Sequence, residues 1–331
     1  MRKRTIIYIA FLLLFFSAET QAQDILLSQP YNNALTVAPS FAGITNGGRA
    51  ALTYRNQWSG INGGRTYNTF VGGVDYFLRD YNSGVGAIFR YDRQGAGMIQ
   101  DIDFGLQYNY RVKLNRDGLY FRPGVQLRVV NKSLDFDQFV FSDQLAVDGS
   151  VLFEKPLFDL ETDAYTKLDA AFSSLLYNKY FWAGFTLDHL IPYRASFLGQ
   201  DGKIPMRIAL TGGYNWIYKS SGWRNRYDET VTFAALVQHQ GSFNQMDLGA
   251  TWTKNIFQLG IWYRGFYPIQ TVSGHDAVVV IAGLNFDSFK IAYSYDVSVS
   301  SLMNTSAGSH EISLQFFFDQ KERSPMSFFC R

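Results

Sequence analysis

Few side chains in this sequence stand at spacings that support chemistry. No two of its four histidines have the His-x-x-x-His spacing of a zinc site; they are His189, His239, His275 and His310. The single cysteine, Cys330, excludes an intramolecular disulfide and a cysteine-based zinc site. The sequence therefore predicts no bound metal and no cofactor.

Candidates for catalysis are equally sparse. The chain has no Gly-x-Ser-x-Gly element of the serine hydrolases. Asp101 and Asp103 resemble a carboxylate pair, but two residues apart on a strand they also suit the solvated lining of one face. The glycine-rich stretch at 60–64 lacks the Lys-Ser/Thr of a phosphate-binding loop. We predict no catalytic residues, and an outer-membrane hydrolase is the least favoured function.

The N-terminus has the features of an export signal. Three basic residues at positions 2–4 precede an apolar run over 6–16, and small residues follow at 20–22. We expect a signal peptide over 1–22, cleaved after Ala22. Its loss removes three of 30 basic and one of 28 acidic residues, which leaves no net charge. A neutral exported chain does not favour nucleic acid as a partner.

The elements that must position any site are strands. Apolar residues alternate with polar ones over 101–112, 119–129, 206–216 and 289–297. Strict alternation indicates a strand whose two faces meet different environments. These segments exceed the 5–6 residues that are usual for soluble strands and fit the roughly 9–11 of a membrane-crossing strand.

We therefore predict an all-β fold, a transmembrane antiparallel β-barrel of about 14 strands in the outer membrane of a Gram-negative cell. A secreted β-sandwich is the alternative, although its strands are shorter and one of its faces is dry. The expected strands are 48–57, 66–78, 84–93, 101–112, 118–130, 167–177, 180–190, 205–217, 229–239, 245–253, 256–264, 276–285, 288–298 and 309–319. An even number of strands places both termini in the periplasm.

One domain follows the signal peptide. It comprises an N-terminal lead over 23–47, which we expect to be periplasmic or to fill the lumen, the barrel over 48–319 and a periplasmic tail over 320–331. Short inner turns are expected at 79–83, 113–117, 178–179, 254–255 and 286–287, with a longer one at 218–228. The apolar loop 131–166 is expected to fold inward or to cover the mouth, with two extra strands as the alternative.

Four segments resemble the PorP/SprF family of type IX secretion membrane proteins. They are Ser28-Gln29-Pro30-Tyr31-Asn32-Asn33 with Ala38-Pro39-Ser40-Phe41-Ala42-Gly43, then Arg55-Asn56-Gln57-Trp58-Ser59-Gly60, then residues 184–192 around Asp188-His189-Leu190, and finally Gly308-Ser309-His310-Glu311-Ile312-Ser313-Leu314. The resemblance runs from residue 23 to about 331. The chain departs from the family pattern at Ala38-Pro39-Ser40 and at its last residues.

The resemblance implies an outer-membrane barrel that assists the export or cell-surface attachment of an adhesin-like protein. Its implied cargo carries a type B C-terminal sorting domain, and gliding adhesins belong to this class. Implied partners are outer-membrane lipid, the secreted cargo and periplasmic components of the secretion machine. The family-motif residues with a structural role are Pro39, Phe41, Gly43, Arg55, Gln57, Trp58, His310 and Glu311.

Two of these motif residues are expected to meet. In a closed barrel the first and last strands are neighbours. Arg55 and Glu311 both fall on the face opposite the apolar residues of their strands, so we expect a charge pair at the outer rim of the seam. In a wet lumen such a pair contributes about 0–1 kcal/mol, and more if it is occluded. Ordinary lumen lining is the alternative. The competing function is a porin-like or hydrophobic-ligand transport barrel.

Overall fold

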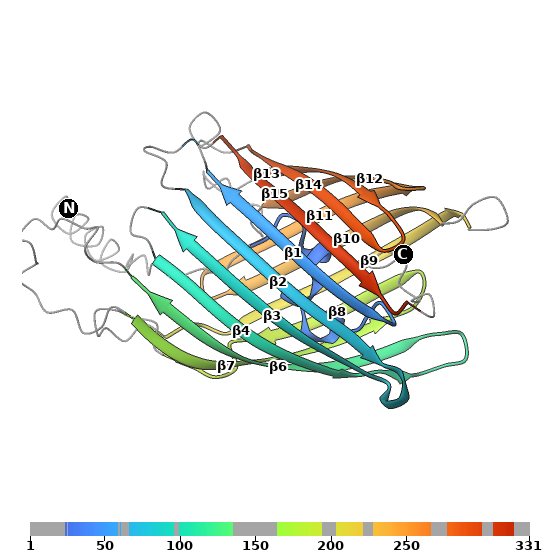
Figure 1. The fold of residues 1–331 in the computed structure, drawn as a ribbon, viewed down its shortest axis with the longest axis horizontal. Coiled ribbons are helices and arrows are strands. Elements are labelled where there is room, and N and C mark those ends of the chain that lie inside the picture. Colours follow the sequence, from blue (N-terminus) through green and yellow to red (C-terminus); the bar gives the residue numbers. More distant parts are fainter. Residues whose placement is uncertain are drawn as a thin grey trace, which may run out of the picture.

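The computed structural model describes residues 24, 26–58, 60, 66–95, 99–134, 164–193, 203–220, 228–265, 277–299 and 307–320. Within them fifteen strands form one antiparallel sheet, which closes through the pairing of β4 with β6. Because β5 only continues β4, the wall has 14 strands and confirms the predicted barrel (Figure 1). No helix in these residues is both long enough and apolar enough to cross a membrane.

The strands follow the predicted bounds closely. They are β1 (Gly48–Gln57), β2 (Tyr67–Leu78), β3 (Ser83–Gln94), β4 (Ile99–Tyr110), β5 (Val112–Lys113), β6 (Tyr120–Ser133), β7 (Ala164–Tyr177), β8 (Phe181–Asp188), β9 (Arg207–Lys219), β10 (Glu229–Gln240), β11 (Phe243–Lys254), β12 (Phe257–Gly265), β13 (Ala277–Asn285), β14 (Phe289–Ser298) and β15 (Ser309–Phe318).

The largest differences from prediction lie around β4, β6 and β7. The expected strand 101–112 is interrupted at Arg111, whose backbone N–H donates to Asn82 O at 2.7 Å. The hairpin of β6 and β7 is longer than predicted, since pairing continues to Ser133 opposite Ala164. Polar residues of this extension do not alternate with apolar ones. Periodicity alone therefore predicts an end of β6 that is too early and a start of β7 that is too late.

The two faces of the wall differ as the alternation predicts. Large apolar side chains are exposed on the outer face, where acyl chains would contact them; they include Leu52, Phe70, Phe104, Leu106, Leu127, Phe233, Ile261 and Phe316. Residues of the inner face are polar and buried, among them Arg49, Arg122, Arg128, Asp169 and Glu311. An apolar outside and a polar inside are the distribution of a membrane barrel.

The two ends of the barrel can be told apart by their connections. At one end, here called the turn end, lie the connections β2–β3, β5–β6, β7–β8, β11–β12 and β13–β14, at the five predicted short turns, together with the longer connection β9–β10. The opposite end is called the loop end. Strand β1 starts and β15 finishes at the turn end, and the two pair along their full length at the seam.

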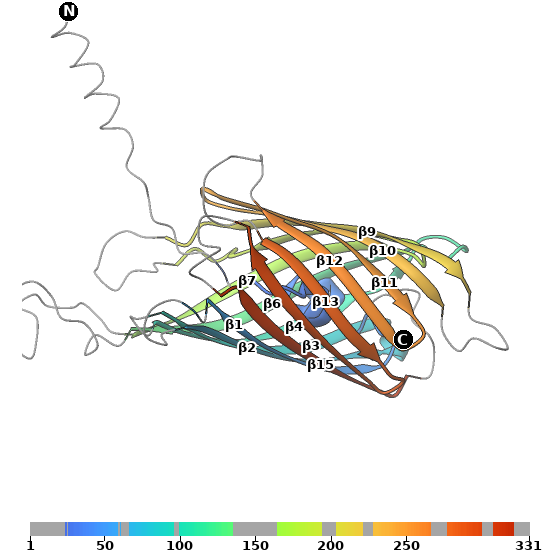
Figure 2. The same cartoon turned by 90° about the horizontal axis from the view of Figure 1, so that it is seen from above.

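The lead runs through the lumen from one end to the other (Figure 2). Asp24 bonds to His189 at the loop end, whereas Gly47 lies at the turn end beside Phe318. We expected both ends of the mature chain on one side because the number of strands is even. That holds for β1 and β15, but the passage of the lead places Asp24 at the opposite end from the last strand.

Several predicted segments lie wholly or largely outside the described residues. They are the signal peptide 1–22, the turn 218–228, the loop 131–166 and the tail 320–331 with Cys330. The inward folding of loop 131–166 stays a prediction.

Candidate functional site

The lead forms the core of the barrel. It contains two 3-10 helices, η1 (Pro30–Thr36) and η2 (Pro39–Phe41), each with proline in its first turn, where the fixed φ of proline suits a helix start. From Leu27 to Arg49 every residue except Thr36 is buried. The lead is therefore packed inside the wall, and its contacts with the wall define the candidate site.

At the loop end, the lead is held at the β1–β15 seam. The Glu311 carboxylate accepts the backbone N–H of Ser28 at 2.6 Å and that of Gln29 at 2.9 Å. Arg55 Nη2 pairs with Asp296 Oδ2 at 2.9 Å, and Asp296 also accepts the Ser28 hydroxyl at 2.7 Å. We call these five residues the seam anchor.

The predicted Arg55–Glu311 pair is part of the seam anchor. The two residues are register partners, with Arg55 Nη1 at 3.5 Å from Glu311 Oε2. The lead excludes solvent, so the side chains are almost fully buried rather than lining a wet lumen. Breaking a buried ion pair typically costs about 3–5 kcal/mol, well above the value for a solvated pair.

A second cluster holds the first described residue of the lead. Asp24 Oδ2 lies 3.0 Å from His189 Nε2 and 3.2 Å from Arg207 Nη1. His189 Nδ1 is 2.7 Å from Asp169 Oδ2, and Arg207 Nη2 is 2.6 Å from Asp188 Oδ2. Together with Arg128, which pairs with both Asp169 and Asp188, these residues form the Asp24 cluster.

His189 lies just beyond β8 in the left-handed backbone region, with φ of 58°. Burial alone would lower the pKa of its imidazole, but the Asp24 carboxylate and the hydrogen bonds to Asp169 and Asp24 raise that pKa to about 9. The ring is therefore protonated at neutral pH and bridges the lead to the wall as a cation.

The Asp24 cluster also contains a possible ligand set for a metal ion. Ligand atoms of Asp24, Asp188 and His189 lie within 4.8 Å of one another. Arg207, however, pairs with both carboxylates, and His189 serves as a cation. These residues already supply the positive charge that a metal ion would bring, so the arrangement is that of an ion-pair cluster.

At the turn end, the lead is held mainly through its backbone. Gly43 N–H donates to Asp75 Oδ2 at 2.7 Å, and Arg49 Nε pairs with Asp75 Oδ1 at 2.8 Å. Arg122 Nη1 donates to Ala42 O at 2.9 Å. Gly43 has φ of 67°, and a Cβ there would lie 2.9 Å from Tyr76 O, so glycine is required.

Apolar packing secures this half as well. Phe41 is fully buried in the main apolar cluster inside the wall. The Tyr31 ring contacts Trp182 edge-on at a centroid distance of 5.8 Å and Trp262 at 5.7 Å. Such ring pairs contribute about 0.5–1.5 kcal/mol beyond the area they bury.

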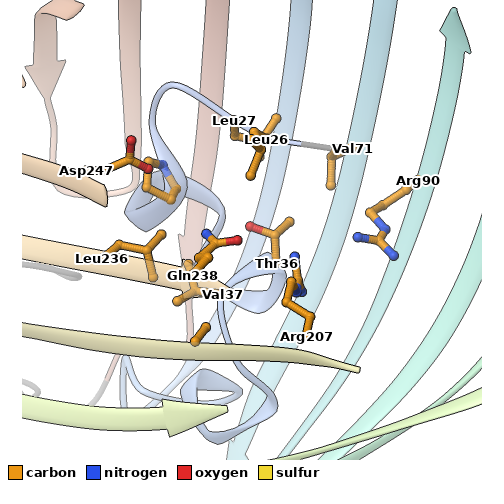
Figure 3. A pocket seen from close by; sticks show the side chains of 12 residues that line it. Leu26, Leu27, Thr36, Val37, Val71, Arg90, Arg207, Leu236, Gln238 and Asp247 are labelled. Carbon is orange, nitrogen blue, oxygen red and sulfur yellow. The ribbon is translucent and has the colours of Figure 1, made fainter. Parts of the chain in front are cut away.

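Little free space separates the lead from the wall. Three cavities lined by described residues offer about 30, 20 and 10 Å³ to the centres of water molecules. One water needs roughly 10–15 Å³ on this measure, so each cavity holds only one or two. In Figure 3, Leu27 and Thr36 of the lead lie between Arg90 on one wall and Asp247 on the other.

The eight motif residues divide into two groups. Pro39, Phe41, Gly43, Arg55 and Glu311 belong to the lead or to the wall that binds it, as described above. The remaining three lie near the loop-end rim of the seam: Gln57 Oε1 accepts from Arg55 Nε at 3.4 Å, Trp58 N–H donates to Gly308 O at 2.9 Å, and His310 Nδ1 lies 2.7 Å from Tyr293 Oη.

Sequence reasoning assigned no role to Asp24, Ser28, His189 or Asp296. Alternation places Asp296 on the inner face, but it cannot name the lead residue that the carboxylate meets. Asp188-His189-Leu190 lies in a segment that resembles the family, and its two adjacent ionisable residues at the end of a strand are the signal that points to a site.

The closed wall, apolar outside and polar inside, defines an outer-membrane β-barrel. The sequence matches the Type IX secretion system membrane protein PorP/SprF family over residues 19–316, and the chain belongs to that family. No curated protein matches it. The family and the outer-membrane fold identify a membrane component of type IX secretion, and neither is a known enzyme class.

Solved barrels share the fold at low sequence identity. The toluene transporter TbuX of Ralstonia pickettii is 10% identical with a TM-score of 0.51, covering 86% of this chain and 93% of that chain. The toluene transporter TodX of P. putida is 10% identical with a TM-score of 0.45, covering 87% and 94%. At this identity the likeness to TbuX supports the fold alone.

Proposed function

We propose that this chain assists the export or the cell-surface attachment of a secreted adhesin-like protein. The observation that carries the proposal is the occupied lumen, in which residues 27–49 are buried except Thr36. A barrel filled by its own chain is suited to hold a protein partner rather than to pass solutes. Adhesins with a type B C-terminal sorting domain, including gliding adhesins, are the cargo that the family resemblance implies.

The proposed orientation has the turn end in the periplasm and the loop end outside the cell. Short connections at the turn end support it, since outer-membrane barrels have short periplasmic turns. With cleavage after Ala22, residue 24 would then lie at the outer mouth. Components of the secretion machine would meet the chain at the turn end.

A transport barrel for small solutes or a hydrophobic ligand is the second candidate. The charged inner wall favours the passage of small polar solutes, because Arg90, Arg128 and Asp169 would line a polar channel if the lead left. Single-channel conductance of the purified full chain separates the two functions. The proposal expects no steady conductance.

The proposed function is tested by affinity purification of a tagged full chain from detergent-extracted membranes. We expect co-purification of a large secreted protein with a C-terminal sorting domain, identified by mass spectrometry. The matched control is an unrelated tagged barrel from the same membranes, which should not retain it. Absence of such a protein together with steady conductance would contradict the proposal and favour transport.

A further inference from the structure

Residues 24–29 are bound by the wall in the way that a receptor binds a peptide. We propose that the loop end of the lumen is a peptide-binding site, occupied here by this segment, and that an acidic segment of a partner protein takes its place. The site consists of the wall residues of the seam anchor and of the Asp24 cluster.

The Asp24 cluster provides the carboxylate-binding part of the site. Its wall residues carry three cations, Arg128, Arg207 and protonated His189, against two carboxylates, Asp169 and Asp188. Asp24 therefore balances the charge of the cluster, and its departure would leave one positive charge in excess as long as His189 stays protonated. An uncompensated buried charge is costly, so a carboxylate at this position is what keeps the cluster neutral with His189 protonated.

Glu311 provides the part that recognises backbone. Its two carboxylate oxygens accept the consecutive N–H groups of Ser28 and Gln29. Every residue except proline carries this donor, so the contact requires a bend that turns two consecutive N–H groups to the same side but no particular side chain. A ligand therefore needs a carboxylate followed, about four residues later, by two consecutive backbone N–H groups.

Two buried atoms at the site have hydrogen-bonding capacity that the lead does not use. Arg207 Nε and Asp296 Oδ1 find no hydrogen-bond partner among the described residues. Unsatisfied buried polar atoms are rare in native proteins, because each costs about 1–3 kcal/mol. A ligand that reaches both atoms would gain contacts that residues 24–29 do not make.

The lead is also a local competitor for its own site. A tethered segment acts at an effective concentration in the millimolar range, so a free peptide binds the intact chain weakly. Two water-sized cavities adjoin the segment, one lined by Asp24 and His189 and the other by Leu27 and Arg207. Water there can solvate polar groups as one segment replaces another.

The test measures binding of a fluorescent synthetic peptide of residues 23–36 to the detergent-solubilised full chain by anisotropy. Asp24→Asn in the chain weakens the tethered segment and should tighten binding of the peptide at least tenfold relative to the wild type. Asp80→Asn, an exposed residue at the turn end, is the matched control and should leave binding unchanged. Asp24→Glu retains the charge and should bind the peptide as weakly as the wild type does.

A comparison of two peptides, one with Asp and one with Asn at position 24, tests whether the Asp24 cluster recognises a carboxylate. The Asp24→Asn chain should bind the native peptide at least tenfold more tightly than a peptide carrying Asn at that position. The added Arg207→Gln substitution should abolish this preference. The proposal is overturned if the Asp24→Asn chain, still a heat-modifiable barrel on gels, binds neither peptide or binds both equally. The test needs no secreted cargo, so its failure is distinct from a failed affinity purification.

Discussion

The two halves of the lead are held in the lumen by different forces. At the loop end, the side chain of Asp24 forms ion pairs with His189 and Arg207, while Glu311 binds the backbone of the lead. Residues 37–46 contact the wall through the buried ring of Phe41 and through backbone bonds to Asp75 and Arg122. The difference indicates that the turn-end half is a fixed part of the core, whereas the loop-end half can respond to competing charges and to pH.

The largest loss of stability is expected from a substitution in the turn-end half of the lead. Phe41→Ala should lower the free energy of unfolding by about 3–5 kcal/mol, because it leaves a cavity beneath a fully buried ring. The measurement is denaturant unfolding in detergent. Tyr81→Ala, in the exposed turn after β2, is the control and should change stability by less than about 0.5 kcal/mol. Equal effects of the two substitutions would mean that the lead is not part of the core.

A smaller loss of stability is expected from a substitution in the wall that holds the loop-end half of the lead. Glu311→Gln should lower the free energy of unfolding by about 2 kcal/mol, since the amide can accept only one of the two backbone N–H groups. The cost stays below that of breaking a whole buried ion pair because Arg55 keeps Asp296 as its partner. Amide exchange of residues 28 and 29 should become faster while that of residues 41–44 stays slow. Faster exchange in both halves would show that they are not independent.

The smallest change in stability is expected from substitution of His310, the motif residue next to Glu311. His310 is on the outer face and contacts Tyr293 and Tyr295, not the lead. His310→Gln should therefore change stability by less than about 0.5 kcal/mol and leave exchange of the lead unaltered. An effect as large as that of Glu311→Gln would contradict the division of the motif into wall and rim residues.

Much of the barrel could be predicted from the sequence, because the alternation of polar and apolar residues depends only on which face of a strand each side chain occupies. Each residue of β1 or β15 shows by its polarity which face it occupies, and the closure of a barrel makes the two strands neighbours. That reasoning was enough to place Arg55 opposite Glu311.

The site itself could not be predicted in the same way. The lead does not alternate, and its bonds join residues that are far apart in sequence, such as Ser28 with Glu311 and Asp24 with His189. Whether the lumen is wet or filled depends on where the lead lies. The burial of the Arg55–Glu311 pair was therefore not accessible from the pattern of the strands alone.

The dependence of the loop-end half on pH follows from His189. The pKa of its imidazole is raised from an ordinary value of 6.5 to about 9. The protonated ring therefore stabilises the loop-end half fully below pH 6.5, and this stabilisation is lost as pH rises through 9. The loss is at most about 3 kcal/mol. The groups that face the imidazole are Asp24 on the lead, Asp169 on β7, Asp188 on β8, Arg128 on β6, Arg207 on β9 and Tyr193 beyond β8.

Hydrogen–deuterium exchange of the wild-type chain at pH 7 and pH 10 tests the difference between the two halves most directly. Comparing residues 24–29 with residues 37–45 in one sample cancels the intrinsic effect of pH on exchange. We predict that both segments are protected at pH 7 and that only residues 24–29 lose protection at pH 10. Exchange of both segments at the rate of an unfolded peptide at pH 7, or equal loss from both at pH 10, would contradict the account.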